Sequence, residues 1–182
     1  MSKDTPIPAE WLPQYTYKDY EKWEGDWELI RGFPYAMSPA PHRRHQYIGG
    51  QFVYAAIDAL NKNKSTCPCE VLYESDWIID DLTIVRPDVM ILCNTPPSDF
   101  VRTPPVLILE IFSQATRLKD RNLKFKLYEE NGVKYYLMAD PERNNMEVFG
   151  LKNNRFEETT STTFHLSDNC TLELDLKNIW PK

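Results

Sequence analysis

The chain has 182 residues, of which 42% are hydrophobic and 26% are charged, an ordinary composition for a soluble globular domain. Its formal net charge of −6 argues against a protein that coats DNA through a generally basic surface. No apolar run reaches the roughly 20 residues that span a bilayer, and the opening stretch MSKDTPIPAEW lacks the apolar core of a secretion signal. We therefore expect a cytoplasmic protein that folds as a single domain over residues 1–182.

The first predicted elements are a short helix, a hairpin and a long helix. Tyr17–Trp23 is predicted to form the short helix, and Trp27–Ile30 and Pro34–Met37 are predicted strands around the turn signal Arg31-Gly32. The stretch His42–Lys62 has apolar residues at a spacing close to the helical period, which predicts the long helix.

The middle of the chain predicts strands and a second helix. Glu70–Ile79 and Thr83–Cys93 are predicted strands, and Pro105–Phe112 is almost wholly apolar, as in a strand buried on both faces. Thr116–Asn131 is a predicted helix, and Gly132 provides its C-terminal stop signal.

The last predicted elements complete a mixed sheet. Strands are predicted over Lys134–Ala139 and Asn145–Phe149, with shorter strands over residues 150–182. The helix that precedes Lys134 serves as a crossover, which favours parallel pairing of the strands on either side of it. This order predicts an α/β (α+β) fold, a mixed sheet flanked by helices with its core over roughly residues 15–149.

The four cysteines are Cys67, Cys69, Cys93 and Cys170. Cys67 and Cys69 form a C-x-C motif, which is not the C-x-x-C spacing of zinc knuckles or redox sites. A structural zinc ion remains an alternative, but free thiols are the usual state of cysteines in a cytoplasmic protein. We therefore expect four free thiols.

Two predicted core strands each carry one acid, Asp88 in LTIVRPDVMILC and Glu110 in PPVLILEIFSQATR. Burying an isolated carboxylate is costly, so each should be paired, metal-bound or at a strand end. In one interpretation the acids lie at sheet edges and are neutralised by Arg86 or Arg102. In the other, adjacent strands bring both carboxylates to a shared Mg²⁺ or Mn²⁺, cations that prefer such oxygen ligands.

Two further charged residues are candidates for the same site. Lys124 lies four residues after Asp120, so the two share one face of the predicted helix. Lys124 either points inward at the acids or belongs to a solvated face of ion pairs. Glu28 either joins the acidic cluster or forms a structural salt bridge with Arg31.

Several short motifs follow one another along roughly residues 15–149. They are Trp27 to Gly32, Met37-Ser38-Pro39, His45, Arg86-Pro87-Asp88, Pro104-Pro105 with Glu110 to Ser113, Asp120, Lys124, Tyr128, Gly132-Val133, Tyr135-Tyr136-Leu137 and Asp140-Pro141. No single motif is specific, but their order and spacing together resemble the PD-(D/E)XK nuclease superfamily. More closely, the chain resembles the bacterial Uma-two family of restriction-endonuclease-like proteins.

The resemblance implies a metal-dependent endonuclease that hydrolyses nucleic-acid phosphodiester bonds, with DNA as the expected substrate. It implies that Mg²⁺ or Mn²⁺ is bound by Asp88, Glu110 and the Ile111 carbonyl. Glu28 and Lys124 then complete a catalytic set of Glu28, Asp88, Glu110 and Lys124. His45 either contacts substrate phosphate or caps its helix.

One position departs from the superfamily's simplest pattern. Phe112 stands two residues after the second acid, where that pattern has a lysine, so Lys124 must replace this lysine from the following helix. Lys126 is the fallback, but it lies about 200° further around the helix and therefore on another face.

Two questions about partners stay open. The acidic composition keeps an alternative function in view, a non-cleaving nucleic-acid-binding or assembly module that retains the nuclease fold. The resemblance also implies a homodimer, because duplex DNA offers two related strands. The candidate basic patches for DNA contact are residues 42–45 and 117–126.

Overall fold

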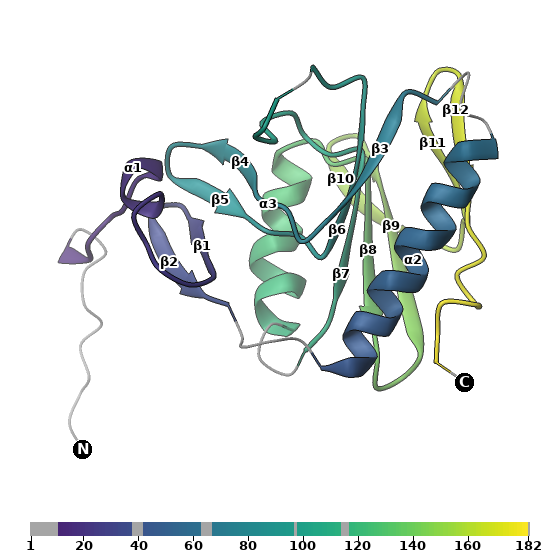
Figure 1. Cartoon of the computed structure of the whole chain (residues 1–182), viewed down its shortest axis with the longest axis horizontal. Coiled ribbons are helices and arrows are strands. Elements are labelled where there is room, and N and C mark those ends of the chain that lie inside the picture. The colour runs from purple at the N-terminus through teal and green to yellow at the C-terminus, as the bar shows by residue number, and fades with distance from the viewer. Residues whose placement is uncertain (1–10, 38–41, 63–66, 97, 114–116, 182) are drawn as a thin grey trace.

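The computed structural model describes residues 11–37, 42–62, 67–96, 98–113 and 117–181. A six-stranded sheet runs through the centre of the molecule (Figure 1). In spatial order its strands are β10 (Arg155–Thr159), β9 (Asn145–Lys152), β8 (Tyr135–Asp140), β7 (Leu107–Ile111), β6 (Val89–Cys93) and β3 (Cys69–Tyr73). β7 and β8 run parallel and the other neighbours antiparallel, so the sheet is mixed, as predicted.

A four-stranded sheet lies beside it, in the order β2 (Phe33–Ala36), β1 (Trp27–Ile30), β5 (Thr83–Val85) and β4 (Trp77–Asp80). The predicted hairpin is confirmed as β1 and β2. Its turn residues Arg31 and Gly32 have φ values of 53° and 81°, a left-handed conformation that suits the tightest hairpin turns. The short helix α1 (Tyr17–Tyr20) precedes this hairpin.

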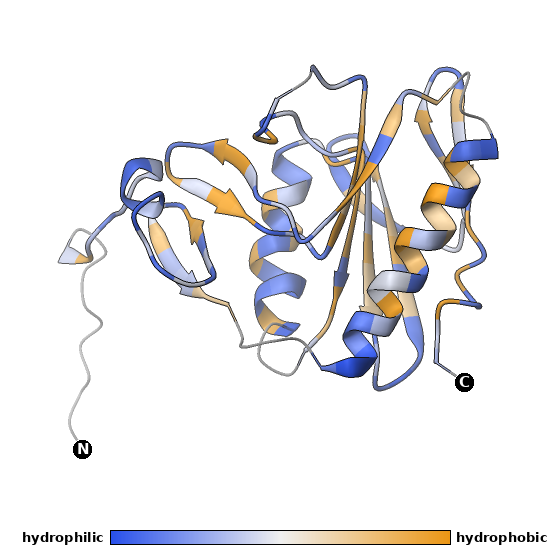
Figure 2. Cartoon of the chain, viewed as in Figure 1, coloured by the Kyte–Doolittle hydropathy of each residue, from blue (hydrophilic) through white to orange (hydrophobic). Residues whose placement is uncertain are grey.

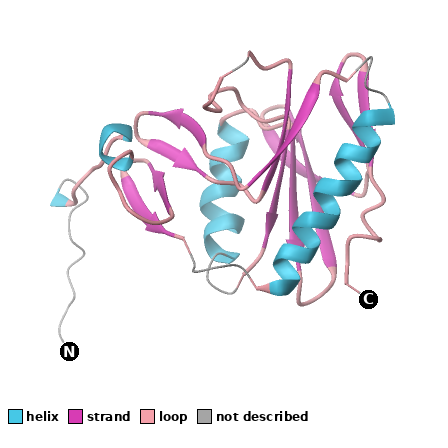
Figure 3. Ribbon diagram, in the orientation of Figure 1, coloured by secondary structure: helices cyan, strands magenta, loops and turns pink. Residues whose placement is uncertain are grey.

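Helices cover both faces of the central sheet (Figure 3). One face packs against α2 (Arg43–Lys62) and the hairpin of β11 (Thr163–Ser167) and β12 (Cys170–Glu173). The other face packs against a π-helical turn (Lys119–Lys124) that continues directly into α3 (Phe125–Glu130). No helix among the described residues is both long and apolar enough to cross a bilayer.

The position of β7 between two cores explains why its sequence is almost wholly apolar. Leu107 and Leu109 join the core beneath α2, whereas Ile108 points to the core beneath α3, because successive side chains of a strand alternate between faces. Figure 2 shows apolar residues gathered along the central strands and along one side of α2. Glu110 shares the face of Ile108, and the fold therefore aims a carboxylate at α3.

Two predicted strands are each divided in the structure. Glu70–Ile79 separates into β3 and β4, which belong to different sheets, because the chain turns at Glu74 with a φ of 48°. Thr83–Cys93 separates into β5 and β6 around Pro87, which has no N–H to contribute to a ladder. Asp88 consequently lies just before β6 rather than inside a strand.

The prediction of four free thiols is wrong for this structure. Cys67 is bonded to Cys170, and Cys69 to Cys93. The two disulfides lie together, since 3.7 Å separates the Cys69 and Cys170 sulfur atoms. The four residues come from three separate segments, and disulfide pairing cannot be deduced from spacing alone.

Some predicted features lie outside the described residues. These are the start of the second long helix at Thr116 and the last two residues of the motif Met37-Ser38-Pro39.

Candidate active site

Asp88 and Glu110 come from neighbouring segments of the central sheet. Antiparallel pairing matches Val89 with Leu109, so Asp88, the residue before β6, lies beside the end of β7 that carries Glu110. The Ile111 N–H also donates a hydrogen bond of 2.5 Å to Asp88 Oδ2. The fold therefore brings the two acidic segments together.

The two arginines considered as neutralising partners are engaged elsewhere. The Arg86 guanidinium pairs with Asp26 at 2.6 Å and with Asp76 at 2.7 Å. The Arg102 guanidinium lies over the ring of Tyr17. A different cation therefore balances the buried acids.

That cation is the ammonium group of Lys124. Its Nζ lies 2.8 Å from Glu110 Oε1, 2.7 Å from Glu28 Oε1 and 3.8 Å from Asp120 Oδ1. The Tyr128 hydroxyl donates a further hydrogen bond of 2.7 Å to Glu110 Oε1. β1, β7 and the helix after β7 thus each contribute side chains to one buried cluster.

The exposed fractions of Lys124 and Lys126 decide whether Lys124 points inward at the acids or belongs to a solvated face of the helix. Lys124 is 3% exposed, whereas the Lys126 side chain is 50% exposed and pairs with Glu129 and Glu130. Lys124 therefore points inward, and Lys126 lies on another face, as expected. Glu28 is fully buried in the cluster, and Arg31 pairs with Glu130 instead.

Lys119 also belongs to this cluster and was not among the residues predicted from sequence. Its Nζ lies 2.5 Å from Glu28 Oε2 and over the ring of Tyr35. In an α-helix, residues five apart point about 140° away from each other. The π-helical turn, with its wider i→i+5 repeat, lets Lys119 and Lys124 hold the two oxygens of one carboxylate.

The pKa values of the two glutamates in the cluster are shifted in opposite directions. Burial raises the pKa of Glu110 well above its ordinary value, and the nearby Asp120 and Asp88 add to this, although Lys124 opposes it. Burial also tends to raise the pKa of Glu28, but the Lys124 and Lys119 ammonium groups outweigh it and hold that pKa below its ordinary value. Glu28 is therefore the glutamate that stays ionised. An additional cation beside Glu110 would favour the ionised form of Glu110.

His45 reaches Asp88 from α2, which packs against the face of the sheet opposite to α3. It lies in the first turn of α2, and its Nε2 is 3.2 Å from Asp88 Oδ1. Its Nδ1 is buried without a hydrogen-bond partner among the described residues. Burial lowers the pKa of His45, but the hydrogen bond and charge of Asp88 outweigh burial and raise it overall.

Asp88, Glu110 and the Ile111 carbonyl offer oxygen atoms, the type of ligand that a hard divalent cation prefers. Mg²⁺ is commonly bound by only one or two carboxylates and keeps several waters, which matches Asp88, Glu110 and the Ile111 carbonyl. Within the described ranges of this structure, in which the cysteines are all in disulfides, no three or more His, Cys, Asp or Glu side chains are grouped to hold a metal ion. Burial and the nearby acids, Asp88 among them, raise the pKa of Glu110, and a cation beside both carboxylates would offset this.

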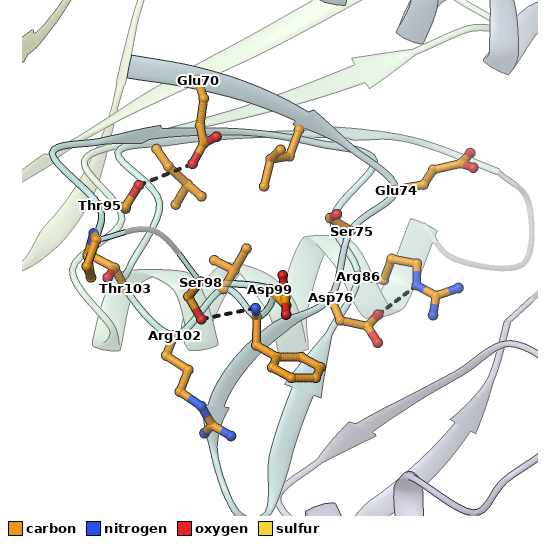
Figure 4. Close-up of a pocket in the computed structure, with 15 residues that line it drawn as sticks. Glu70, Glu74, Ser75, Asp76, Arg86, Thr95, Ser98, Asp99, Arg102 and Thr103 are labelled. Atoms are coloured by element: carbon orange, nitrogen blue, oxygen red, sulfur yellow. Dashed lines mark hydrogen bonds and ion pairs between the residues drawn. The ribbon is translucent and has the colours of Figure 1, made fainter. Parts of the chain in front are cut away.

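A separate cavity of about 570 Å³ lies between β3 and the segment 94–103 (Figure 4). Its wall includes the Arg86–Asp76 ion pair and the Glu70 carboxylate, which accepts a hydrogen bond of 3.1 Å from Thr95. None of the clustered acids or lysines described above lines it. The cavity is therefore not the candidate active site.

Comparisons with known proteins agree with this arrangement. The model of the Uma2 family, described as "Putative restriction endonuclease", matches residues 16–180. The crystal structure of a putative nuclease belonging to DUF820 from Anabaena variabilis has a TM-score of 0.70 and 15% sequence identity. That match covers 90% of this chain and 98% of the other, and at this identity it establishes the fold alone. The search of curated proteins gave no significant match.

The restriction-endonuclease-like fold expected from sequence is thus confirmed. The family model spans nearly the whole chain, including every residue of the buried cluster. The chain belongs to the Uma2 family, the Uma-two family that its motifs resemble.

Proposed function

We propose that this protein is a metal-dependent endonuclease that hydrolyses DNA phosphodiester bonds in the cytoplasm. The observation that carries the proposal is the buried Lys124, whose ammonium group contacts Glu110 and Glu28 at 2.8 and 2.7 Å. Because Asp88 accepts a hydrogen bond from the residue that follows Glu110, the site combines neighbouring oxygen ligands with a fixed cation. Phosphoryl transfer is accelerated mainly by such positioned charges.

In this proposal, Asp88, Glu110 and the Ile111 carbonyl hold Mg²⁺ or Mn²⁺. Such an ion, when bound, would polarise a phosphoryl oxygen and acidify a bound water. Asp88 is positioned for its role by the Ile111 N–H, and Glu110 by the Tyr128 hydroxyl.

The two lysines have different proposed roles. Burial tends to lower the pKa of Lys124, but Glu110 and Glu28 raise it well above its ordinary value. Lys124 therefore stays charged and acts as an electrostatic stabiliser or hydrogen-bond donor rather than as a general base. The Lys119 side chain is 15% exposed against 3% for Lys124, so Lys119 is the better placed to contact a phosphate. Glu28 holds both ammonium groups in position.

DNA contact is proposed for a local basic rim, because the whole chain is acidic. The start of α2 and the start of the π-helical turn lie at the same end of the central sheet (Figure 1). The rim comprises Arg43, Arg44 and His45 from α2, Arg117 just before the π-helical turn and Arg121 within it. Cations placed this way neutralise phosphates without reading sequence. We further propose a homodimer, which would present two such sites to the two strands of a duplex.

Plasmid cleavage tests the proposal. Wild type with Mg²⁺ or Mn²⁺ should nick supercoiled DNA, and a chelator should abolish nicking. Asp88→Asn and Glu110→Gln should each lower the rate more than about 100-fold, because each removes a proposed ligand. Lys126→Ala, on the solvated face of the same helix, is the matched control and should retain activity.

Two outcomes would contradict the proposal. Equal nicking by wild type and both ligand variants would identify a contaminating nuclease. A folded wild type that binds DNA but cleaves with neither metal would favour the alternative, a non-cleaving binding module, which the net charge of −6 keeps in view.

A further inference from the structure

All four cysteines of the chain converge at one edge of the central sheet. Cys69 begins β3 and Cys67 lies two residues before it, Cys93 ends β6, and Cys170 begins β12. The Cα atoms are 4.7 Å apart in the Cys67–Cys170 pair and 4.0 Å apart in the Cys69–Cys93 pair. This cysteine cluster is distinct from the acidic site, because it packs in the core beneath α2, whereas Lys124 and Glu110 meet on the α3 side of the sheet.

One sulfur–sulfur distance between the two pairs nearly equals an edge of a zinc–thiolate tetrahedron. Four sulfur atoms held about 2.3 Å from a zinc ion stand about 3.8 Å from one another along the edges of a tetrahedron. The Cys69 and Cys170 sulfur atoms already lie 3.7 Å apart. Reduction of each disulfide would let its own two sulfur atoms separate to ordinary van der Waals contact, which is of the same size.

The backbone around the cluster can accommodate that separation. Cys69 and Cys93 form the terminal pair of the β3–β6 ladder, where strands open most easily. Cys170 is the first residue of β12, and Cys67 lies outside any strand. Cys67 and Cys170 are buried, whereas Cys69 and Cys93 are half-buried at the sheet edge, so part of the thiolate charge would be solvated.

We propose that the reduced cysteine cluster is a structural Zn²⁺ site with four thiolate ligands, and that the two disulfides are its oxidised form. Two equivalents of a dithiol reductant would each transfer two electrons and two protons, giving four protein thiols and two oxidised dithiols. Zn²⁺ would then displace the four thiol protons. Soft thiolates select zinc over Mg²⁺, so the two sites would not compete for the same ion.

The proposal also reconciles the cysteines with a reducing compartment. In the cytoplasm proposed above, disulfides do not persist. Without a metal, reduction would cut both covalent links between the β11–β12 hairpin, the start of β3 and the end of β6. A shared zinc ion would keep these three segments joined in that environment.

Zinc content of the full-length chain tests the proposal. Protein reduced with a phosphine, loaded with Zn²⁺ and desalted without oxygen should hold about one zinc ion per chain by elemental mass spectrometry. Co²⁺ in place of Zn²⁺ should give the intense sulfur-to-cobalt charge-transfer absorption of thiolate ligation. The double variant Cys93→Ser/Cys170→Ser should bind zinc at least about 100-fold more weakly.

Two controls separate this site from others. Ser167→Ala alters the cross-strand neighbour of Cys170 and should keep the zinc. Asp88→Ala alters the acidic site and should also keep it, so failure of the nuclease proposal would leave this result unaffected.

The wild type alone supplies a second measurement in case the double variant does not fold. A thiol-specific oxidant added to the zinc-loaded chain should release the ion to a chromogenic chelator as all four thiols become resistant to alkylation. Reduced wild type that retains no zinc, or zinc that survives formation of both disulfides, would overturn the proposal. Full zinc binding by a folded double variant would do the same.

Discussion

At the scale of single residues, Lys124 balances the buried charge. Its ammonium group is the shared partner of Glu110 and Glu28, and all three side chains are almost completely removed from solvent. Removing one member of a buried ion cluster leaves the others desolvated and uncompensated, which costs more than the intact pairing contributes. The same residue that the proposed reaction requires is therefore also required by the fold.

We expect Lys124→Met to lower the free energy of unfolding by about 3–5 kcal/mol. Lys126→Met, on the exposed face of the same helix, should change it by less than about 0.5 kcal/mol. Urea denaturation of both variants at neutral pH measures the difference. Equal losses would mean that Lys124 does not compensate the buried carboxylates.

Glu129 gives the fold a pH dependence of known sign. The Phe156 N–H donates a hydrogen bond of 2.7 Å to Glu129 Oε2, and this bond holds the pKa of Glu129 below its ordinary value of 4.5. A lowered folded-state pKa stabilises the native chain above the unfolded pKa and loses that contribution as pH falls through the folded value. Glu129 is therefore expected to tie α3 to β10 most strongly near neutral pH.

The measurement is a series of unfolding curves between about pH 6 and about pH 3 for wild type and Glu129→Gln. The stability difference between them should shrink as pH falls. A difference that stays constant over this range would show that the Glu129 charge makes no contribution.

At the scale of elements, sequence patterns predicted the type of most helices and strands, but not where one strand ends and the next begins. The Arg31-Gly32 turn signal, helical periodicity and the crossover helix correctly predicted the β1–β2 hairpin, α2 and the parallel pairing of β7 with β8, respectively. They missed the breaks at Glu74 and Pro87, because the residues on either side of each break have strand propensity and only tertiary packing assigns them to different sheets.

The candidate site was likewise predicted only in part from the sequence. Glu28, Asp88, Glu110 and Lys124 were proposed from sequence, and the fold gathers Glu28 and Glu110 around the Lys124 ammonium group, with Asp88 nearby. Lys119 was missed, because a π-helical turn has no reliable sequence signature and α-helical spacing places this residue on another face.

Lys119→Met tests the role of that turn. If Lys119 contacts a DNA phosphate, its loss should slow plasmid nicking at least about tenfold and lower the salt slope of DNA binding by about one. Asn122→Ala, at an exposed position of the same turn, is the control and should change neither. Slower nicking with an unchanged salt slope would assign Lys119 to positioning Glu28 instead.

At the scale of the whole molecule, the disulfides join parts of the chain that are remote in sequence. Cys67 and Cys170 are 103 residues apart, and their bond fastens the C-terminal hairpin to the edge of the central sheet. Together with the two cores that share the central sheet, this bond supports our proposal that residues 1–182 form one domain. One domain should unfold in a single transition.

The stability of the oxidised, metal-free chain should depend measurably on the Cys67–Cys170 disulfide. Cys170→Ser is expected to lower the free energy of unfolding by about 2–5 kcal/mol, because closing so long a loop restricts the unfolded ensemble. Ser167→Ala in the same hairpin should have little effect. Guanidinium denaturation gives both values, and an unchanged midpoint for Cys170→Ser would show that the link adds no stability.

The bond between Cys67 and Cys170 also closes residues 67–170 into a covalent ring. A protease that cuts once inside this ring, for example beside the exposed Phe100, opens it without releasing a fragment. The nicked oxidised protein should therefore migrate as one full-mass band on a denaturing gel and divide into two bands only after a reductant is added.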